Sequence, residues 1–248
     1  MQGGGDFDLQ GGRAYWRPAS PDRPLHGLTL LVVEDSRLAS EAVRLLCLRS
    51  GARIRRADCL RSAARHLRNY RPAAVIVDLG LPDGNGTQLI AQIAGGADGP
   101  AVLGMSGDPD AQGAAMAAGA GGFLAKPVEN LALFQQVVLS ALPAHMRWPG
   151  PRALPDDMLR PGSAGLREDL THAAKLLDKG PDRREIDYIT HFLAGVARIS
   201  GDRGLEDAAA RLQDGQDRAA GLEPISGLLR ERLSAHLPEC PARRPDQA

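Results

Sequence analysis

The sequence predicts an α/β domain with a doubly wound, five-stranded parallel sheet, followed by an all-α bundle of four helices. Two observations predict this. Short apolar runs alternate with amphipathic stretches up to about residue 143, and beyond residue 165 the pattern is purely helical. Strand–helix units in series favour a parallel sheet with helices on both faces. The length of 248 residues suits two ordinary domains.

The expected strands are short and mostly apolar. Residues 28–33 and 73–77 are typical of strands buried on both faces. Residues 53–56 carry three arginines and are expected near an edge of the sheet. The other two strands are expected at 101–105 and 122–125. Helices are expected at 36–50, 60–70, 86–93, 111–118 and 129–142.

The chain is expected to divide into five segments. Glycine and proline without periodicity indicate a flexible arm at the start, and a second proline- and glycine-rich stretch indicates a linker. The segments are an arm (1–26), the α/β domain (27–143), a linker (144–164) with a short helix at 156–159, the helical domain (165–238) and a tail (239–248). The helices of the second domain are expected at 166–177, 183–200, 205–213 and 225–237.

The composition excludes several classes of protein. Basic and acidic residues are equal at 30 each, so no overall positive field favours nucleic acid or a membrane surface. No apolar run is long enough to span a membrane. Cys47, Cys59 and Cys240 are odd in number and widely spaced, which fits neither a disulfide framework nor a zinc site. A cytoplasmic location is expected.

Polar side chains follow four of the expected strands. Glu34 and Asp35 follow the first, Asp78 the third, Ser106 the fourth and Lys126 the fifth. Because ligands bind at the carboxyl ends of strands in doubly wound sheets, these residues are expected to lie together. Three carboxylates beside one lysine favour a hard cation, and oxygen ligands of this kind suit Mg²⁺.

In these motifs the sequence resembles the response-regulator receiver family, over roughly residues 27–143. The matching segments are Val33-Glu34-Asp35-Ser36, Val77 to Gly86, Met105-Ser106-Gly107 and Phe123-Leu124-Ala125-Lys126-Pro127. The resemblance implies a flavodoxin-like fold. It also implies phosphorylation of the protein by a histidine kinase or a phosphotransfer protein, without turnover of a substrate.

The resemblance implies a role for each acidic residue. Asp78 is the expected nucleophile, which would become an aspartyl-phosphate. Glu34, Asp35, Asp78 and Gly80 are the expected positions of the Mg²⁺ site. Lys126 is expected to pair with Asp78 and then with a phosphoryl oxygen.

The resemblance also implies a conformational switch. Ser106 is expected to bind another phosphoryl oxygen, and Phe123 to swing inward in response. Pro127 is expected to follow a cis peptide bond. An aspartate-nucleophile phosphatase is a weaker alternative, because Gly80 stands where such enzymes usually carry a second acid.

A histidine in the second domain has a distinctive setting. At about 100° per residue, His191 lies opposite the apolar stripe of its helix and is expected to face solvent, with Gly195 one turn later. The stripe is formed by Ile186, Ile189, Leu193 and Val196. The segment resembles the motif of histidine phosphotransfer domains, over about residues 155–237. That resemblance implies a four-helix bundle that relays the phosphoryl group through His191.

One residue departs from this second motif. Ala194 stands where the family usually has a lysine, although Arg198 on the same face offers a cation. Two functions therefore stay open: a relay through His191, or a degenerate domain that only binds a downstream protein partner. A DNA-binding role is disfavoured, because acidic and basic residues are interspersed after residue 145.

Overall fold

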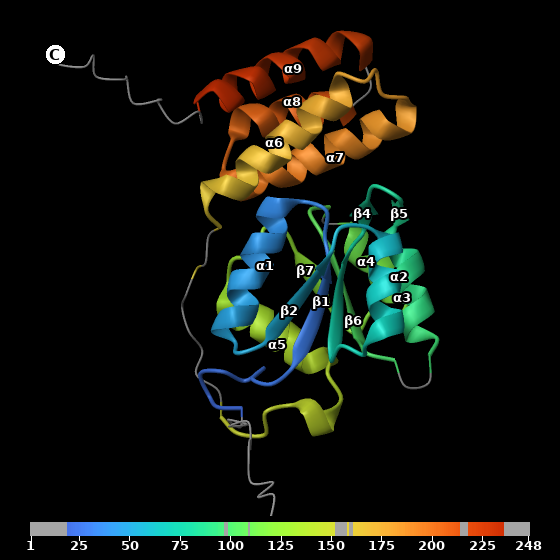
Figure 1. Cartoon of the computed structure of the whole chain (residues 1–248), viewed down its shortest axis with the longest axis vertical. Helices are drawn as coiled ribbons and strands as arrows, with labels where there is room; N and C mark the ends of the chain where they lie inside the picture. The colour runs from blue at the N-terminus through green and yellow to red at the C-terminus, as the bar shows by residue number, and fades with distance from the viewer. Residues whose placement is uncertain are drawn as a thin grey trace, which may run out of the picture.

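The first domain is built on a five-stranded parallel sheet. The computed structural model describes residues 19–96, 99–108, 110–151, 158, 161–213 and 218–235 (Figure 1). The strands follow the order β2-β1-β3-β6-β7, so the expected edge position of β2 is confirmed. Their bounds are β1 Thr29–Val33, β2 Arg53–Ala57, β3 Ala74–Asp78, β6 Ala101–Ser106 and β7 Phe123–Ala125. The predicted doubly wound fold is confirmed.

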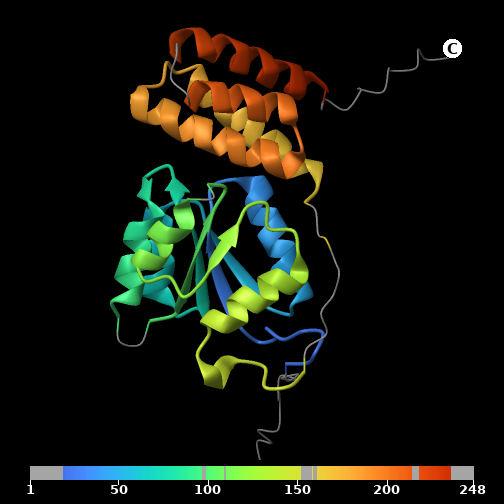
Figure 2. The same ribbon diagram turned by 180° about the vertical axis from the view of Figure 1, so that it is seen from behind.

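Helices cover both faces of the sheet. The helices α1 (Arg37–Arg49) and α5 (Leu131–Ala141) lie on one face. The other face is covered by α2 (Leu60–Asn69), α3 (Gly86–Ala94) and α4 (Ala111–Ala117), as Figures 1 and 2 show. Successive residues of β1 therefore enter different core clusters on opposite faces. This explains why β1 is a continuous apolar run rather than an alternating one.

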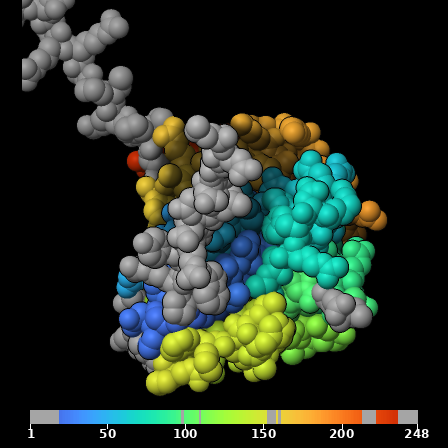
Figure 3. All heavy atoms as spheres, turned by 60° about the horizontal axis from the view of Figure 1, so that its bottom comes forward, coloured from blue at the N-terminus to red at the C-terminus, as the bar shows by residue number. Residues whose placement is uncertain are grey.

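The ordered part of the first domain begins before residue 28. Leu25 is fully buried, and its amide donates to the carbonyl of Ser50 over 3.0 Å. It joins the core cluster that contains Phe134 of α5. Figure 3 shows this side of the molecule, with blue residues of the early chain beside the yellow residues of the α5 region. The prediction of a flexible arm up to residue 26 is wrong here, while residues 1–18 lie outside the described part.

Small elements were missed by the sequence patterns. The strands β4 (Gly80–Leu81) and β5 (Gly84–Asn85) form a short antiparallel hairpin directly after β3. A 3₁₀ turn occupies Ala144–Met146, inside the expected linker. The predicted short helix at 156–159 lies outside the described residues, apart from residue 158, which forms an isolated bridge with Asn130.

The second domain is helical, as predicted. Its helices are α6 (Ser163–Leu177), α7 (Arg183–Ser200), α8 (Arg203–Gln213) and α9 (Arg218–Ala235). They pack around a separate apolar cluster that includes Leu170, Ile189, Leu193, Leu205 and Leu229. α6 begins two residues before the predicted domain boundary at 165. α9 begins before the predicted start at 225, because the helix continues through Pro224.

The helical domain covers the carboxyl ends of the strands (Figure 1). Leu38, in the first turn of α1, is 3% exposed and belongs to the apolar cluster of the helical domain. Gly165 of α6 lies so close to α1 that an added Cβ would stand 3.0 Å from the Leu38 nitrogen. The two domains are therefore packed together at the edge where the polar residues of the sheet gather. Among the described helices, none has the length and apolarity that crossing a membrane requires.

Candidate phosphoryl-acceptor site

Three carboxylates converge at the carboxyl end of the sheet. Glu34 and Asp35 follow β1 directly, and Asp78 is the last residue of β3, the strand paired with β1. Ligand oxygens of the three side chains lie within 4.8 Å of one another. Glu34 is fully buried and Asp78 is 6% exposed. The parallel pairing of β1 with β3 therefore brings together residues more than forty positions apart.

Lys126 supplies one positive charge to this cluster. Its Nζ lies 2.6 Å from Oε2 of Glu34 and 3.1 Å from Oδ1 of Asp78. Burial alone would lower the pKa of Lys126. The Asp78 and Glu34 carboxylates outweigh burial and raise the pKa above its ordinary value, so the ammonium stays charged. The peptide bond between Lys126 and Pro127 is cis, as expected. The pairing with Glu34 was not predicted, because the family resemblance implied only the pairing with Asp78.

The cluster has the character of a divalent-cation site. One lysine faces three carboxylates, so ionising all three would leave an uncompensated buried negative charge. Burial raises the pKa of Glu34 well above its ordinary value, and burial with the nearby Asp78 charge raises that of Asp35 to about 6. Oxygen donors with excess negative charge fit Mg²⁺. Gly80, the other expected position of the Mg²⁺ site, lines a cavity together with these three carboxylates.

These raised pKa values predict a pH-dependent stability. A carboxyl whose pKa is higher in the folded state favours folding below its ordinary pKa of 3.8, and that contribution is lost as the pH rises through about 6. Without divalent cations, Asp35→Asn is expected to gain stability over the wild type by on the order of 2 kcal/mol between pH 4 and 7. Urea unfolding in a chelator measures this difference. A constant difference across the pH range would contradict it.

The two expected switch residues lie on adjacent strands, β6 and β7. Ser106 ends β6, and its Oγ accepts a hydrogen bond of 3.1 Å from the Asp108 amide. Phe123 begins β7 and packs half-buried against the core. Gly104 leaves room for this ring, because an added Cβ would lie 3.2 Å from Cδ2 of Phe123. Both residues lie where the sequence predicted them, at adjacent strands.

The helical domain covers the site. A cavity of about 530 Å³ lies between the two domains, and residues of both domains line it. From the sheet come Glu34, Asp35, Asp78, Ser106 and Lys126, and from α7 come His191, Ala194, Gly195 and Arg198. The structure thus brings the predicted residues of both domains to one cavity. The sequence patterns did not predict this meeting.

His191 is exposed, as its helical position predicted, but the exposed ring faces this interdomain cavity. Its Nδ1 lies 2.7 Å from the carbonyl oxygen of Asp187. Because a carbonyl can only accept, Nδ1 carries the proton in this contact, and Nε2 of the neutral ring keeps the lone pair. An added Cβ at Gly195 would meet nothing within 4 Å, so the helix surface is bare there.

Arg198 is the cation that α7 brings to the cavity. Its Nη1 donates to the carbonyl oxygen of Gly107, next to Ser106, and its Nε lies 3.2 Å from Glu206. Ala194 is 6% exposed and packs with the core of the helical domain. The positive charge of α7 at the site therefore comes from position 198 and not from position 194.

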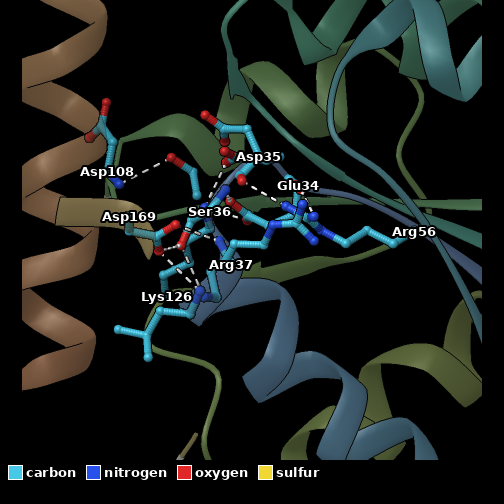
Figure 4. A network of polar contacts seen from close by, with 12 residues as sticks. Glu34, Asp35, Ser36, Arg37, Arg56, Asp108, Lys126 and Asp169 are labelled. Carbon is cyan, nitrogen blue, oxygen red and sulfur yellow. Dashed lines mark hydrogen bonds and ion pairs between the residues drawn. The ribbon is translucent and has the colours of Figure 1, made fainter. Parts of the chain in front are cut away.

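Three residues that the sequence patterns did not indicate hold the metal-site loop, and Figure 4 shows two of them, Arg56 and Asp169. Arg56 donates to the backbone carbonyls of Glu34 and Asp35, over 3.1 and 2.7 Å. Tyr188 of α7 donates its hydroxyl hydrogen to Oδ2 of Asp35. Burial, and then the Asp35 charge, raise the pKa of Tyr188 above its ordinary value, so the phenol stays a donor at neutral pH.

Asp169 of α6 caps the first helix of the other domain. Its carboxylate accepts hydrogen bonds from the Ser36 hydroxyl and from the amides of Arg37 and Leu38, over 2.7, 2.7 and 3.0 Å. Amides in the first turn of a helix have no partner within the helix, so an acidic side chain stabilises them. The sequence held one signal for this role. Asp169 shares a helix face with Leu166 and Leu170, which is unusual for a carboxylate.

We expect Asp169→Ala to lower the free energy of unfolding by about 1–2 kcal/mol, because three donors lose their acceptor. It is also expected to speed amide exchange in the first turn of α1. The neighbouring Glu168→Ala is a matched control. Its ion pair with Arg37 spans 3.4 Å between side chains that are more than half exposed, so little change is expected. Equal effects of the two substitutions would contradict the capping role.

A five-stranded parallel sheet flanked by helices, with an acidic cluster at the carboxyl ends of its strands, defines the class of receiver-like domains. The family model of the response regulator receiver domain matches residues 30–138. These residues therefore form a response regulator receiver domain, a module of two-component signalling. No curated protein matches the chain.

Several solved structures are similar to the chain. One is assigned to the response regulators, from Chloroflexus aurantiacus, with 29% identity over 45% of this chain and 97% of that one, and a TM-score of 0.42. A second is the signal receiver domain of a histidine kinase from Syntrophus aciditrophicus, with 25% identity, 46% and 89% coverage, and a TM-score of 0.42. A third is the receiver domain of a sensor histidine kinase from Pseudomonas aeruginosa with magnesium in its active-site cleft, with 21% identity, 46% and 97% coverage, and a TM-score of 0.42.

Proposed function

We propose that the chain is a phosphorelay protein whose receiver domain accepts a phosphoryl group on Asp78. Receiver domains exchange phosphoryl groups with histidine kinases or phosphotransfer proteins, and these are the proposed partners. The observation that carries the proposal is the buried cluster in which Lys126 contacts both Asp78 and Glu34. Bound by Glu34, Asp35, Asp78 and Gly80, Mg²⁺ would supply positive charge that offsets the charge on the phosphoryl oxygens.

The residues around Asp78 are suited to hold the transferred group. Asp78 supplies the attacking carboxylate oxygen, and the bond between phosphorus and the donor nitrogen breaks. The Lys126 ammonium, already 3.1 Å from Asp78, pairs with one phosphoryl oxygen. The Ser106 hydroxyl donates to another, and its movement lets Phe123 turn inward.

His191 is the proposed second acceptor. In the transfer its Nε2 lone pair forms the bond to phosphorus, the bond to Asp78 breaks, and the electron pair returns to the carboxylate. The contact between Nδ1 and the Asp187 carbonyl supports this role, because in the neutral ring it places the proton on Nδ1 and keeps the lone pair on Nε2. Arg198 supplies the positive charge that Ala194 lacks. The shared cavity supports transfer between the two domains of one chain.

A second candidate is a helical domain that only binds proteins. Ala194 favours it, because an apolar residue there removes a cation that phosphotransfer domains usually carry. The hydrogen bonds of Asp169 and Tyr188 with the receiver domain favour this candidate as well, because a domain that only binds proteins would make contacts of this kind. In this case phosphorylation of Asp78 would control which protein the helical domain contacts.

Trans-phosphorylation of two full-length variants separates these candidates. A phosphorylated receiver is offered to Asp78→Asn, which retains His191, and to the double variant Asp78→Asn/His191→Gln. A relay predicts labelling of Asp78→Asn and none of the double variant. If Asp78→Asn takes no label from the phosphorylated receiver, His191 is silent and the domain is a binding module.

A further inference from the structure

A residue of the helical domain contacts an expected metal ligand of the receiver domain. The Tyr188 hydroxyl of α7 donates to Oδ2 of Asp35, across 153 positions of sequence. The Tyr188 ring packs against Phe192, with centroids 5.9 Å apart and planes tilted by 35°. Phe192 in turn contacts the ring of His172 on α6, at 5.7 Å. The phenol is therefore held in place by the core of the helical domain.

The backbone of the metal-site loop is held by other contacts. Arg56 binds the carbonyls of Glu34 and Asp35, and the Asp169 carboxylate binds the chain directly after them, at Ser36 and Arg37. With its backbone fixed on both sides, Asp35 keeps freedom only in its side chain torsions. The hydrogen bond from Tyr188 selects one orientation of that carboxylate, with Oδ2 occupied by the phenol.

We propose that Tyr188 is a positioning residue for the Mg²⁺ site, so that Mg²⁺ binding and docking of the helical domain stabilise each other. The proposal rests on the Mg²⁺ site of the proposed function. Hydrogen bonds to ligating carboxylates orient them, and loss of such a partner typically weakens metal binding tenfold to a hundredfold. Because coupling between two equilibria is reciprocal, a domain contact that strengthens Mg²⁺ binding is itself strengthened by Mg²⁺.

Calorimetric titration of the full chain with MgCl₂ tests the first half of the proposal. Tyr188→Phe removes the hydroxyl and keeps the ring that packs on Phe192, so it is expected to fold. Its dissociation constant for Mg²⁺ is expected to rise about tenfold. Tyr70→Phe is the matched control, because it removes a buried phenol hydroxyl at the end of α2, outside the acidic cluster. The control is expected to bind Mg²⁺ within about twofold of the wild type.

The outcomes separate this proposal from the proposed function. If the wild-type protein binds no Mg²⁺, the proposed metal site does not exist, and both the proposed function and the role of Tyr188 are contradicted. Wild-type binding with unchanged affinity in Tyr188→Phe would leave the site standing and overturn the role of Tyr188. Tighter binding in Tyr188→Phe would also overturn it, because the phenol would then compete with the metal for Asp35.

Hydrogen exchange tests the second half. The amides of Arg37 and Leu38 donate to Asp169 across the domain interface, so their exchange reports docking. Mg²⁺ is expected to slow their exchange in the wild type and in Tyr70→Phe, and to have a smaller effect in Tyr188→Phe. An equal effect of Mg²⁺ in all three proteins, or none in the wild type, would show that the two equilibria are not coupled.

Discussion

Asp78→Asn is expected to abolish phosphoryl acceptance by the receiver domain, with a loss of at least about a thousandfold in the labelling rate. An amide oxygen is a far weaker nucleophile than a carboxylate. Among the described carboxylates at strand ends, Glu34 is the other one that contacts Lys126, and its side chain is fully buried. Incubation with a small phosphoramidate donor and Mg²⁺, followed by intact mass measurement, gives the rate.

Asp83→Asn provides the control for this prediction. Asp83 lies on the turn between β4 and β5, and its carboxylate accepts from the amides of Leu60 and Arg61, over 2.8 and 3.0 Å. Its loss is expected to affect the start of α2 and to leave labelling near the wild-type rate. Comparable loss of labelling in the two variants would mean that Asp78 has no special role.

Lys126→Met is expected to lower the free energy of unfolding by about 3–5 kcal/mol at pH 7 without divalent cations. The substitution leaves the buried Glu34 and Asp78 carboxylates without the ammonium that contacts both. Below about pH 6 the defect is expected to shrink, because protonation of Asp35 removes negative charge, and the raised pKa of Glu34 acts in the same direction. Mg²⁺ is expected to restore part of the stability for the same reason.

Urea unfolding at several pH values measures this effect. Lys179→Met is the matched control, since Lys179 is exposed just after α6, and a change within about 0.5 kcal/mol is expected there. A Lys126→Met protein that is as stable as the wild type, or whose defect grows at low pH, would contradict the account of a lysine-compensated acidic cluster.

The receiver half was largely predictable because its signals are local. Each strand is a short run of apolar residues, and the residue after it marks the edge where ligands gather, so Glu34, Asp78 and Lys126 could be placed together. Weaker signals failed. The two-residue strands β4 and β5 have no periodicity to detect, and Leu25 stands alone among glycines and prolines. The last helix was expected only from residue 225, although α9 begins at Arg218 and contains Pro224.

The meeting of the two domains could not be predicted from local patterns. Asp169 and Tyr188 contact residues more than 130 positions away, and a single sequence carries no record of such a pairing. The helical pattern predicted a bare, exposed surface beside His191, and that part was right. The receiver domain of the same chain faces this surface, across the cavity that Asp78 and His191 both line.

Mapping the phosphorylated residue is the most direct test of the central claim that Asp78 is a magnesium-dependent phosphoryl acceptor. The full chain is incubated with a small phosphoramidate donor, with Mg²⁺ or with a chelator, and the modified residue is located by rapid mass spectrometry. The account predicts a phosphoryl group on Asp78 in the presence of Mg²⁺, and little or none with the chelator. Phosphorylation that bypasses Asp78, or that is equally fast with the chelator, would contradict it.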